Sequence, residues 1–317
     1  MSRAAAGVTL AARVVAAFGR HYLVRDAGRP HAPLLTATRR GKRGDVVVGD
    51  LVQCTAAGEQ ASIESIDARR TLLFRADAHR VKPLAANVDL VAVVFAPRPP
   101  FNPSFVWRAL AAARAAGIDA LAIVNKTDMT DGLALAQAVL AQAARLGVAT
   151  VALSAKTAPE DARTRLAAAC GGRAVLLVGQ SGMGKSSLLN LRVDANARTQ
   201  EYSTRLNVGK QTTTASRWFD VPAAQGGGAM VDTPGFTAFG LAHLSLAQRL
   251  AALPDLAAFD GQCRFADCRH VNEPDCAVRA AVARGDIGSE RYAFYLELAA
   301  ESGHSQPAAQ SLAFAGP

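Results

Sequence analysis

Short hydrophobic runs, separated by Gly, Pro and charged residues, fill the first part of the chain. Between Ala12 and Arg69 these runs are rich in residues that favour strands. There are five of them: RVVAAF, HYLVRD, PLLTATRR, DVVVGDLVQC and QASIESID. The pattern predicts a small antiparallel barrel or sandwich, and five strands fit an OB-fold, whose open face and loops commonly bind oligonucleotides. We expect this domain to span residues 1–86.

From Asn87 the pattern changes to apolar strands that alternate with helices, which is typical of a parallel sheet with crossover helices. The predicted strands are VDLVAVVFA, DALAIVN, VATVALS and AVLLVG. The predicted helices are SFVWRALAAARAAG, GLALAQAVLAQAARLG, a short one near Asp161 to Cys170, and SSLLNLR. We expect an α/β domain over residues 87–245, with ligands bound at the carboxyl ends of its strands.

Beyond Leu241 the pattern is helical and more polar, and it ends in a predicted amphipathic helix, SERYAFYLELAAE. We expect a small, mainly helical domain over residues 246–302 and a flexible tail over residues 303–317. The predicted fold class is therefore multidomain, with an all-β OB-fold barrel, an α/β domain and a small helical domain in that order.

Composition limits where the protein works. No apolar run approaches the roughly 20 residues that a membrane-spanning helix needs, and Arg13 interrupts the stretch that would form the core of a signal peptide. We therefore expect a cytoplasmic protein that does not contact a membrane.

The net charge of +9 is concentrated at the N-terminus, because residues 1–86 hold 14 Lys and Arg against 7 Asp and Glu. Such an excess favours contact with a nucleic-acid backbone. The loop RRGKR, from Arg39 to Arg43, is the candidate contact, although an ordinary solvated loop explains the same residues equally well.

The segment GQSGMGKSS matches the phosphate-binding loop G-x-x-x-x-G-K-S and lies between a predicted strand and a predicted helix, as that motif requires. Its glycines allow successive backbone N–H groups to face a β-phosphate, and the helix N-terminus adds partial positive charge. Lys185 would reach the β- and γ-phosphates, and Ser186 would bind Mg²⁺. The predicted phosphate-binding residues are Gly179, Gln180, Ser181, Gly182, Met183, Gly184, Lys185, Ser186 and Ser187.

The segment NKTD, earlier in the chain, matches the base-reading motif of GTP-binding proteins. The Asp128 carboxylate would accept hydrogen bonds from guanine N1–H and the exocyclic amino group, which adenine does not present there. Asn125 would tie this loop to the base and to the phosphate loop, and the Lys126 stem would cover the ring. One strand later, Ser154, Ala155 and Lys156 form the segment SAK, whose backbone N–H groups would contact guanine O6.

A third motif, DTPG, follows the predicted apolar strand GAMV. Asp232 would hold Mg²⁺ through water, and the Gly235 N–H would lie near the γ-phosphate. In the usual G domain the phosphate loop comes first, but here it follows the two base segments and precedes GKQTTT and DTPG. This is the usual set cyclically shifted, and relocating chain termini between surface loops preserves the spatial arrangement. The sequence therefore predicts a circularly permuted GTP-binding domain.

Three of the five cysteines lie close together near the C-terminus, which suits a metal site in a reducing compartment better than a disulfide framework. Three thiolates and one imidazole with the spacing C-x4-C-x-H-x5-C match a closed, structural zinc site. The predicted zinc ligands are Cys263, Cys268, His270 and Cys276. Cys54 and Cys170 lie in apolar contexts and are expected in the core.

These features together resemble the circularly permuted GTPases, and most closely the ribosome small-subunit-dependent GTPase A (RsgA) family. The resemblance covers nearly the whole chain: the basic barrel, the permuted motifs and the Cys/His cluster. It implies a GTPase that binds the small ribosomal subunit and its rRNA late in assembly, with hydrolysis stimulated by that subunit. It also implies Mg²⁺ bound with GTP and one structural Zn²⁺. Binding to one asymmetric particle favours a monomer.

The residue that positions the attacking water departs from the family pattern. Phe236 follows DTPG where many small GTPases carry Gln, and an aromatic ring cannot orient water. Members of the family usually carry a His before the Thr run, whereas this chain has Gln211, which can donate to and accept from water without titrating. Thr213 resembles the switch residue that would close on Mg²⁺ and the γ-phosphate, with Thr212 and Thr214 as neighbouring alternatives. We predict weak intrinsic turnover that depends on the ribosome to position the switches.

Two other functions fit parts of the sequence. Gln211 and Phe236 suit a nucleotide-gated RNA-binding module that barely hydrolyses GTP. A permuted GTPase of large-subunit assembly is the other, although the barrel combined with a C-terminal zinc cluster argues against it. Because DTPG is the last motif, nucleotide state could also reorient the zinc domain, so that this domain and the barrel would grip rRNA together.

Overall fold

The fold is described from a computed structural model, which describes residues 8–29, 31–39, 46–76, 81–193, 216–236 and 239–301. Gln211 and Thr213, with Thr212 and Thr214, lie outside these residues. So do most of the loop RRGKR and the predicted tail.

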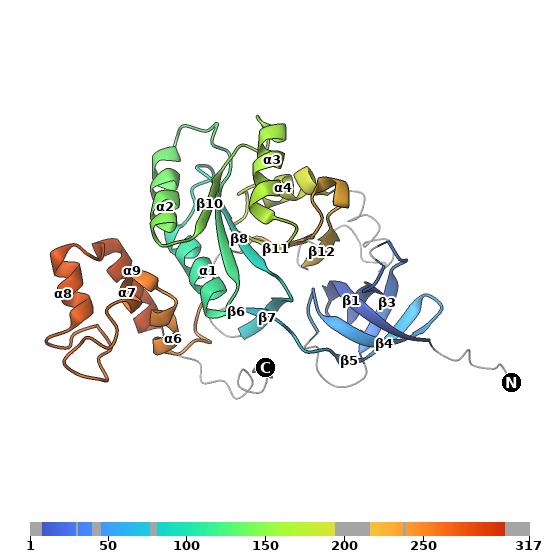
Figure 1. The fold of residues 1–317 in the computed structure, drawn as a ribbon, viewed down its shortest axis with the longest axis horizontal. Coiled ribbons are helices and arrows are strands. Elements are labelled where there is room, and N and C mark those ends of the chain that lie inside the picture. The colour runs from blue at the N-terminus through green and yellow to red at the C-terminus, as the bar shows by residue number, and fades with distance from the viewer. Residues whose placement is uncertain are drawn as a thin grey trace.

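Five N-terminal strands close into a barrel, as the sequence predicts (Figure 1). They are β1 (Val8–Phe18), β2 (His21–Asp26), β3 (Leu35–Arg39), β4 (Leu51–Ala57) and β5 (Gln60–Ile66). Their order is β1-β2-β3-β5-β4, and β4 pairs back with β1 to close the barrel. Alternate side chains such as Val14, Val24, Val52 and Ile63 point inward and are fully buried. The OB-fold prediction is confirmed.

The run DVVVGDLVQC is not one strand. Only its second half belongs to β4, whereas Val46 and Val47 are buried outside any strand and lead into a turn at Val48 and Gly49. Gly49 has φ +92°, and a Cβ there would lie 2.0 Å from the Ala86 carbonyl oxygen. Glycine is needed for this conformation and this close approach. The turn at Gly49 therefore prevents the apolar residues before it from forming one strand with β4.

A separate hairpin leads from the barrel to the central domain. Its strands, β6 (Leu72–Ala76) and β7 (Val81–Ala86), pair with each other and form a two-stranded sheet. An isolated bridge joins Ala76 to Gly240, far along the chain. In Figure 1 the hairpin lies below the central sheet, on the side that faces the barrel.

The central domain is a sheet with helices on both faces, in the order β10-β9-β8-β11-β13-β12. The strands are β8 (Leu90–Phe95), β9 (Asp119–Val124), β10 (Ala149–Ala152), β11 (Ala174–Val178), β12 (Arg217–Asp220) and β13 (Ala229–Asp232). All neighbours are parallel except β12 and β13. The helices are α1 (Pro103–Ala115), α2 (Leu133–Arg145), α3 (Pro159–Cys170) and α4 (Lys185–Arg192), with a 3₁₀ turn, η1, at Ala223–Gln225. Helices α1 and α2 cover one face of the sheet, and α3 and α4 the other (Figure 1).

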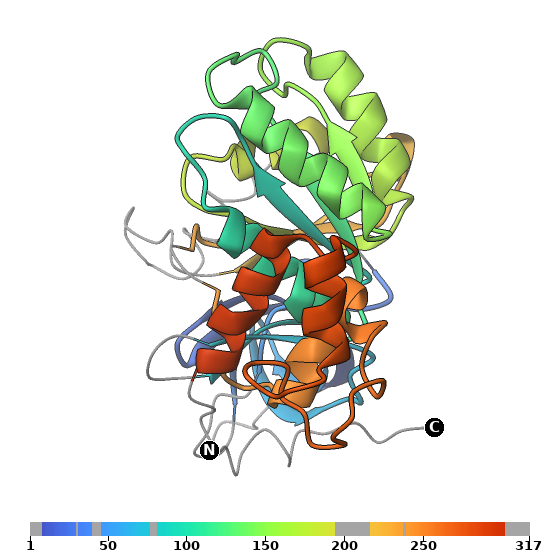
Figure 2. The ribbon, with the colours of Figure 1, turned by 90° about the vertical axis from the view of Figure 1, so that its left-hand side faces the viewer.

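The C-terminal region is helical and packs beside α1 (Figure 2). It contains α6 (Leu246–Ala251), α7 (Pro254–Ala257), α8 (Ala277–Arg284) and α9 (Ser289–Ala300). Arg291 of α9 joins it to the central domain, because its guanidinium pairs with Asp255 at 2.8 Å and lies 4.8 Å from the centre of the Trp107 ring on α1. None of the helices in the described ranges is long and apolar enough to cross a membrane.

Candidate functional site

The three predicted nucleotide motifs meet at one edge of the central sheet. Asn125 follows β9, Gly179 follows β11 and Asp232 ends β13. These strands run parallel, so their carboxyl ends lie along the same edge. Residues more than 100 positions apart in the chain are thereby brought into one site, at the edge where open α/β sheets bind ligands.

The phosphate-binding loop is tightly constrained by its neighbours. Gly179 lies against β8, where an added Cβ would be 2.4 Å from the Val94 carbonyl oxygen. Gly184 has φ +92°, and a Cβ there would be 2.2 Å from Asn125 Nδ2. The side-chain oxygen of Gln180 accepts a hydrogen bond of 2.7 Å from the Asn102 N–H. These contacts constrain the backbone of the loop, and a side chain at Gly179 or Gly184 would clash with its neighbours.

Lys185 is buried within this loop. Its ammonium donates to the carbonyl oxygens of Gly179 at 2.8 Å and Gln180 at 3.0 Å. Burial lowers the pKa of Lys185, and the charge of Asp232 opposes that shift. Ser186 and Ser187 are exposed at the start of α4, where backbone N–H groups and the helix dipole favour an anion.

Asp232 has an unsatisfied oxygen. Its Oδ1 is buried and accepts no hydrogen bond from any residue that the structure describes. Burial raises the pKa of the carboxyl group, and the charges of Lys185 and Arg217 oppose that shift. A buried carboxylate oxygen without a donor is costly unless a cation or a water molecule completes it. Oxygen ligands of this kind are what Mg²⁺ prefers, so Asp232 fits the magnesium site that GTPases use.

Gly235 and Phe236 lie directly against the phosphate loop. A Cβ on Gly235 would be 3.0 Å from the backbone of Ser181, and the Phe236 N–H donates to the Gly179 carbonyl oxygen at 3.4 Å. The Phe236 side chain is only 5% exposed. Its ring is packed into the protein and offers no group that could orient a water molecule.

In the base-reading loop, Asn125 links two segments. It is 1% exposed, its Nδ2 donates to the Met183 carbonyl oxygen at 3.1 Å, and its Oδ1 accepts from the Ala155 N–H at 3.1 Å. Lys126 has φ +61°, and its ammonium donates to the Gly182 carbonyl oxygen at 2.7 Å and to that of Arg98 at 2.9 Å. These bonds fix the base-reading loop, the SAK segment and the phosphate loop relative to one another.

Asp128 is held as an acceptor. Its Oδ1 accepts a hydrogen bond from the Ser154 hydroxyl, which in turn accepts from the Thr157 hydroxyl at 2.7 Å. The Ser154 hydrogen bond is the main cause that lowers the pKa of Asp128, so the carboxylate is ionised at neutral pH. Asp128, Ser154 and Thr157 line a cavity of about 340 Å³. Lys156, the last residue of the SAK segment, is exposed. Thr157 was not among the predicted site residues, and it follows directly after SAK.

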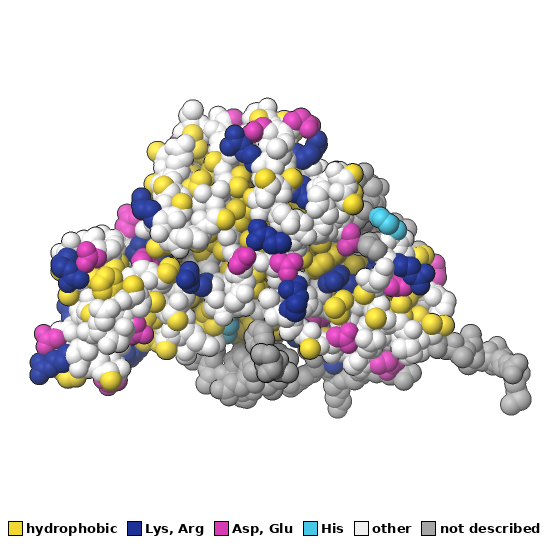
Figure 3. Space-filling view, viewed as in Figure 1, with side chains coloured by type: hydrophobic (Ala, Val, Ile, Leu, Met, Phe, Trp, Pro, Cys, Tyr) yellow, Lys and Arg dark blue, Asp and Glu magenta, His cyan; other side chains and the backbone are white. Residues whose placement is uncertain are grey.

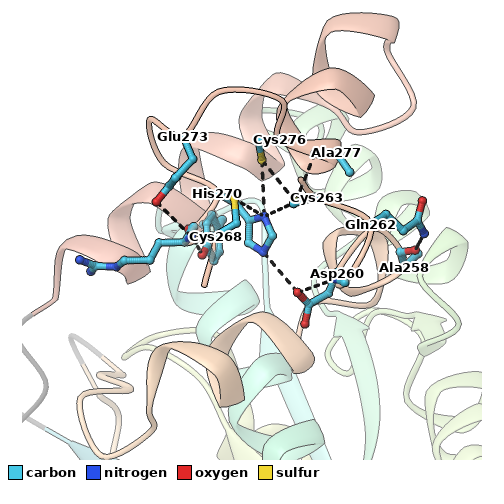
Figure 4. A network of polar contacts seen from close by, with 12 residues as sticks. Ala258, Asp260, Gln262, Cys263, Cys268, His270, Glu273, Cys276 and Ala277 are labelled. Carbon is cyan, nitrogen blue, oxygen red and sulfur yellow. Dashed lines mark hydrogen bonds and ion pairs between the residues drawn. The ribbon is translucent and has the colours of Figure 1, made fainter. Parts of the chain in front are cut away.

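The four predicted metal ligands come together in the C-terminal region (Figure 4). His270 Nδ1 lies 3.4 Å from the sulfur of Cys263 and 3.5 Å from those of Cys268 and Cys276, and the Cys263 and Cys276 sulfurs are 4.0 Å apart. With bonds of about 2.3 Å to sulfur and about 2.0–2.1 Å to nitrogen, a tetrahedral metal would separate its ligand atoms by roughly 3.5–3.8 Å. The cluster therefore fits a tetrahedral metal ion.

Residues around the cluster orient these ligands. His270 Nε2 lies 3.4 Å from Asp260 Oδ1, an arrangement that fixes which ring nitrogen faces the metal (Figure 4). Glu273 accepts hydrogen bonds from its own backbone N–H and from those of Val271, Arg269 and Asn272, and together these lower its pKa to about 2. The Tyr292 hydroxyl donates to the His270 carbonyl oxygen at 2.8 Å. Sequence spacing gave no signal for these supporting residues, because they are not ligands.

A phosphate-binding loop, a guanine-type base loop and DTPG, cyclically shifted along an α/β sheet, define a circularly permuted P-loop GTPase. A family model described as RsgA GTPase matches residues 66–242. The chain belongs to the RsgA GTPase family.

Curated relatives agree with this assignment over nearly the whole chain. The protein named small ribosomal subunit biogenesis GTPase RsgA is 44% identical in Ralstonia nicotianae, over 93% of this chain and 92% of the relative. The same-named protein of Bordetella pertussis is 43% identical, over 93% of this chain and 97% of the relative.

Two solved structures share the fold. The crystal structure of YjeQ from Thermotoga maritima matches with a TM-score of 0.68 and 26% identity, over 93% of this chain and 99% of that one. The crystal structure of YloQ, a circularly permuted GTPase, matches with a TM-score of 0.66 and 22% identity, over 97% of this chain and 99% of that one. The predicted fold class and GTPase activity are confirmed.

Proposed function

We propose that this GTPase acts in the biogenesis of the small ribosomal subunit, binding the subunit and its rRNA in the cytoplasm late in assembly and hydrolysing GTP there as a monomer. The observation that carries the proposal is identity of 42–44% with proteins named small ribosomal subunit biogenesis GTPase. The matches span more than nine tenths of this chain, so they include the barrel and the Cys/His cluster as well as the GTPase domain.

The proposed nucleotide contacts follow from the positions of the motifs. Backbone N–H groups of residues 179–187 surround the phosphates, and Lys185 contacts the β- and γ-phosphates. Asp128 accepts from guanine, supported by the Ser154 hydrogen bond that lowers the pKa of its carboxyl group and keeps it an acceptor. Asn125, Lys126 and residues 154–156 complete the base site, and the Gly235 N–H faces the γ-phosphate.

Magnesium would be held by Ser186 and Asp232, with Thr213 closing on it in the GTP state. The unsatisfied oxygen of Asp232 supports this assignment. When bound, the ion neutralises charge that develops on the phosphates. Gln211 is our proposed water-positioning residue, because Phe236 is buried and has no polar group to serve instead.

We propose that the barrel makes the main contact with the rRNA backbone. Residues 1–86 have twice as many Lys and Arg as Asp and Glu, whereas residues 246–301 have 6 Lys and Arg against 9 Asp and Glu. On the face of the described residues in Figure 3, basic side chains stand singly among acidic and apolar ones. The charge excess therefore points to the barrel and its RRGKR loop, rather than to the C-terminal region, as the phosphate contact.

Co-sedimentation with isolated ribosomal subunits tests the proposed partner. We expect the protein to sediment with 30S subunits in the presence of a non-hydrolysable GTP analogue, and to do so less with GDP. Binding should weaken steeply as salt rises, because counterions are released from neutralised phosphates. Preferential sedimentation with 50S subunits would overturn the proposal and favour a role in large-subunit assembly.

We also propose that the Cys/His cluster holds one structural zinc ion. Three sulfur ligands with one imidazole are typical of closed structural zinc sites. These four protein ligands would fill a tetrahedral coordination sphere and leave no position for a catalytic water. Asp260 would act on the metal through His270, as carboxylates do in other zinc sites. The ion would stabilise a region whose helices are short.

Removing one ligand should release the metal and loosen the C-terminal region. In Cys268→Ser we expect zinc content, measured by plasma mass spectrometry, to fall from one per chain to near zero, and tryptic cleavage to appear within residues 246–301. Affinity for GDP should stay close to that of the wild type, because the base and phosphate loops lie elsewhere. Cys54→Ala, which changes a buried cysteine of the barrel, is the control and should retain zinc. A wild-type protein that carries no zinc when purified without chelator would contradict the proposal.

A further inference from the structure

Strand β6 lies alongside the segment that follows DTPG. Ala76 and Gly240 exchange two backbone hydrogen bonds, of 3.2 and 3.1 Å. A Cβ on Gly240 would come within 2.8 Å of the Ala76 carbonyl oxygen, so glycine is needed for this approach. On the same strand, the Phe74 ring lies 5.8 Å from that of His243. The hairpin and this segment are therefore joined by backbone hydrogen bonds and by a contact between side chains.

Arg75, between these two contacts, covers Phe236. Its guanidinium carbon lies 4.6 Å from the centre of the Phe236 ring. Among the described residues Arg75 forms no ion pair, so the ring is its clearest partner there. The Phe236 ring also meets Phe239 edge-on at 6.2 Å, and Phe239 meets Phe105 of α1 at 6.1 Å. Phe236 is thus held between a cation on one strand and an aromatic cluster.

Phe236 directly follows Gly235 and is one of the contacts that hold this segment against the phosphate loop. The two residues are consecutive, and both touch the phosphate loop, Gly235 at Ser181 and Phe236 at the Gly179 carbonyl oxygen. A glycine has few conformational restrictions of its own, so its N–H direction depends on what holds its neighbours. The hairpin that carries Arg75 is itself anchored to the barrel, because the Ala86 N–H donates to the Val48 carbonyl oxygen at 2.9 Å.

We propose that Arg75 is a positioning residue for GTP hydrolysis: by holding the Phe236 ring, it keeps the Gly235 N–H aimed at the γ-phosphate. This rests on the proposed role of Gly235. Arg75 touches neither the phosphate loop nor the base loop in any contact the described residues show, so it acts through Phe236 and not on the nucleotide. Losing it should therefore change the rate of hydrolysis and leave ground-state binding of GDP intact.

Single-turnover hydrolysis with enzyme in excess tests the proposal, because it resolves slow rates. We expect Arg75→Ala to lower the hydrolysis rate roughly 10-fold to 100-fold, the size of effect that small misplacement of a reacting group produces. The GDP dissociation constant should change less than about 2-fold. Arg75→Lys should recover part of the rate, because it retains a cation over the ring, whereas Arg75→Gln should not. Arg145→Ala, which removes an equal charge from the exposed end of α2, should behave as the wild type.

A double-mutant cycle separates positioning from general destabilisation. If Arg75 acts through the ring, Arg75→Ala should have little further effect in a Phe236→Leu background, while two independent defects would multiply. A wild-type rate in Arg75→Ala, or equal losses in Arg75→Lys and Arg75→Gln, would overturn the inference and leave the GTPase proposal standing. A wild-type protein with no hydrolysis, alone or with 30S subunits, would instead overturn the proposed function together with it.

Discussion

Replacing Asp128 with Asn is expected to change the base that the protein prefers. The carboxylate accepts from two donors of guanine, and an amide cannot accept from both because its NH₂ group is a donor. Xanthine presents a carbonyl oxygen in place of the amino group, which suits that NH₂ group. We expect the preference for GTP over xanthosine triphosphate to fall by a factor on the order of 10⁴, as measured by competition for a fluorescent nucleotide.

The variant has a suitable control in Asp119→Asn, which removes the same charge from an exposed residue paired with Arg173 at the opposite edge of the sheet. That variant should bind both nucleotides as the wild type does. Asn at position 128 can still accept from the Ser154 hydroxyl, so the loop should keep its shape. An Asp128→Asn protein that still prefers GTP by the original factor would show that this loop does not read the base.

Replacing Lys185 with Ala is expected to abolish hydrolysis. The ammonium is the cation built into the phosphate loop, and developing charge on the transferred phosphoryl group would lose its nearest fixed partner. Removing one such preorganised donor commonly costs on the order of 10³-fold in rate. Nucleotide binding should weaken as well. Arg114→Ala, an exposed change on α1, is the control, and a Lys185→Ala protein with more than about a tenth of the wild-type rate would contradict the assignment.

Local patterns were sufficient to predict the motifs of the central domain and its parallel strands, but not the antiparallel strand β12. The phosphate loop is recognisable because a strand, a glycine-rich turn and a helix follow one another directly in the chain. The base-reading motif is recognisable in the same way, because Asn125 directly follows the strand β9. The order of the motifs along the chain was enough to predict the permutation. The DTPG segment likewise begins at Asp232, the last residue of β13.

Long-range pairs could not be predicted in this way. Arg25 of the barrel pairs with Asp220 of β12 across 195 positions at 2.8 Å, and nothing near either residue indicates its partner. The contact of Arg75 with Phe236 is of the same kind. The run Val46–Val48 was predicted as strand because its residues are apolar, and the positive φ of Gly49 was not visible in that pattern.

The Cys/His cluster could be predicted from the sequence only in part. Spacing alone was sufficient to find the four ligands, because they are within fourteen residues of each other. It did not reveal Asp260, which precedes the first cysteine by three positions and approaches His270 only in the folded chain. The residues that tune a site are thus harder to predict than those that form it, since their signal is spatial.

Hydrolysis of GTP by the purified protein, measured alone, with 30S subunits and with 50S subunits, tests the central claim most directly. We predict slow turnover alone, strong stimulation by 30S subunits and none by 50S subunits, with Lys185→Ala inactive in all three. Tight, GTP-dependent binding to 30S subunits without stimulated turnover would contradict this account and indicate a nucleotide-gated RNA-binding module.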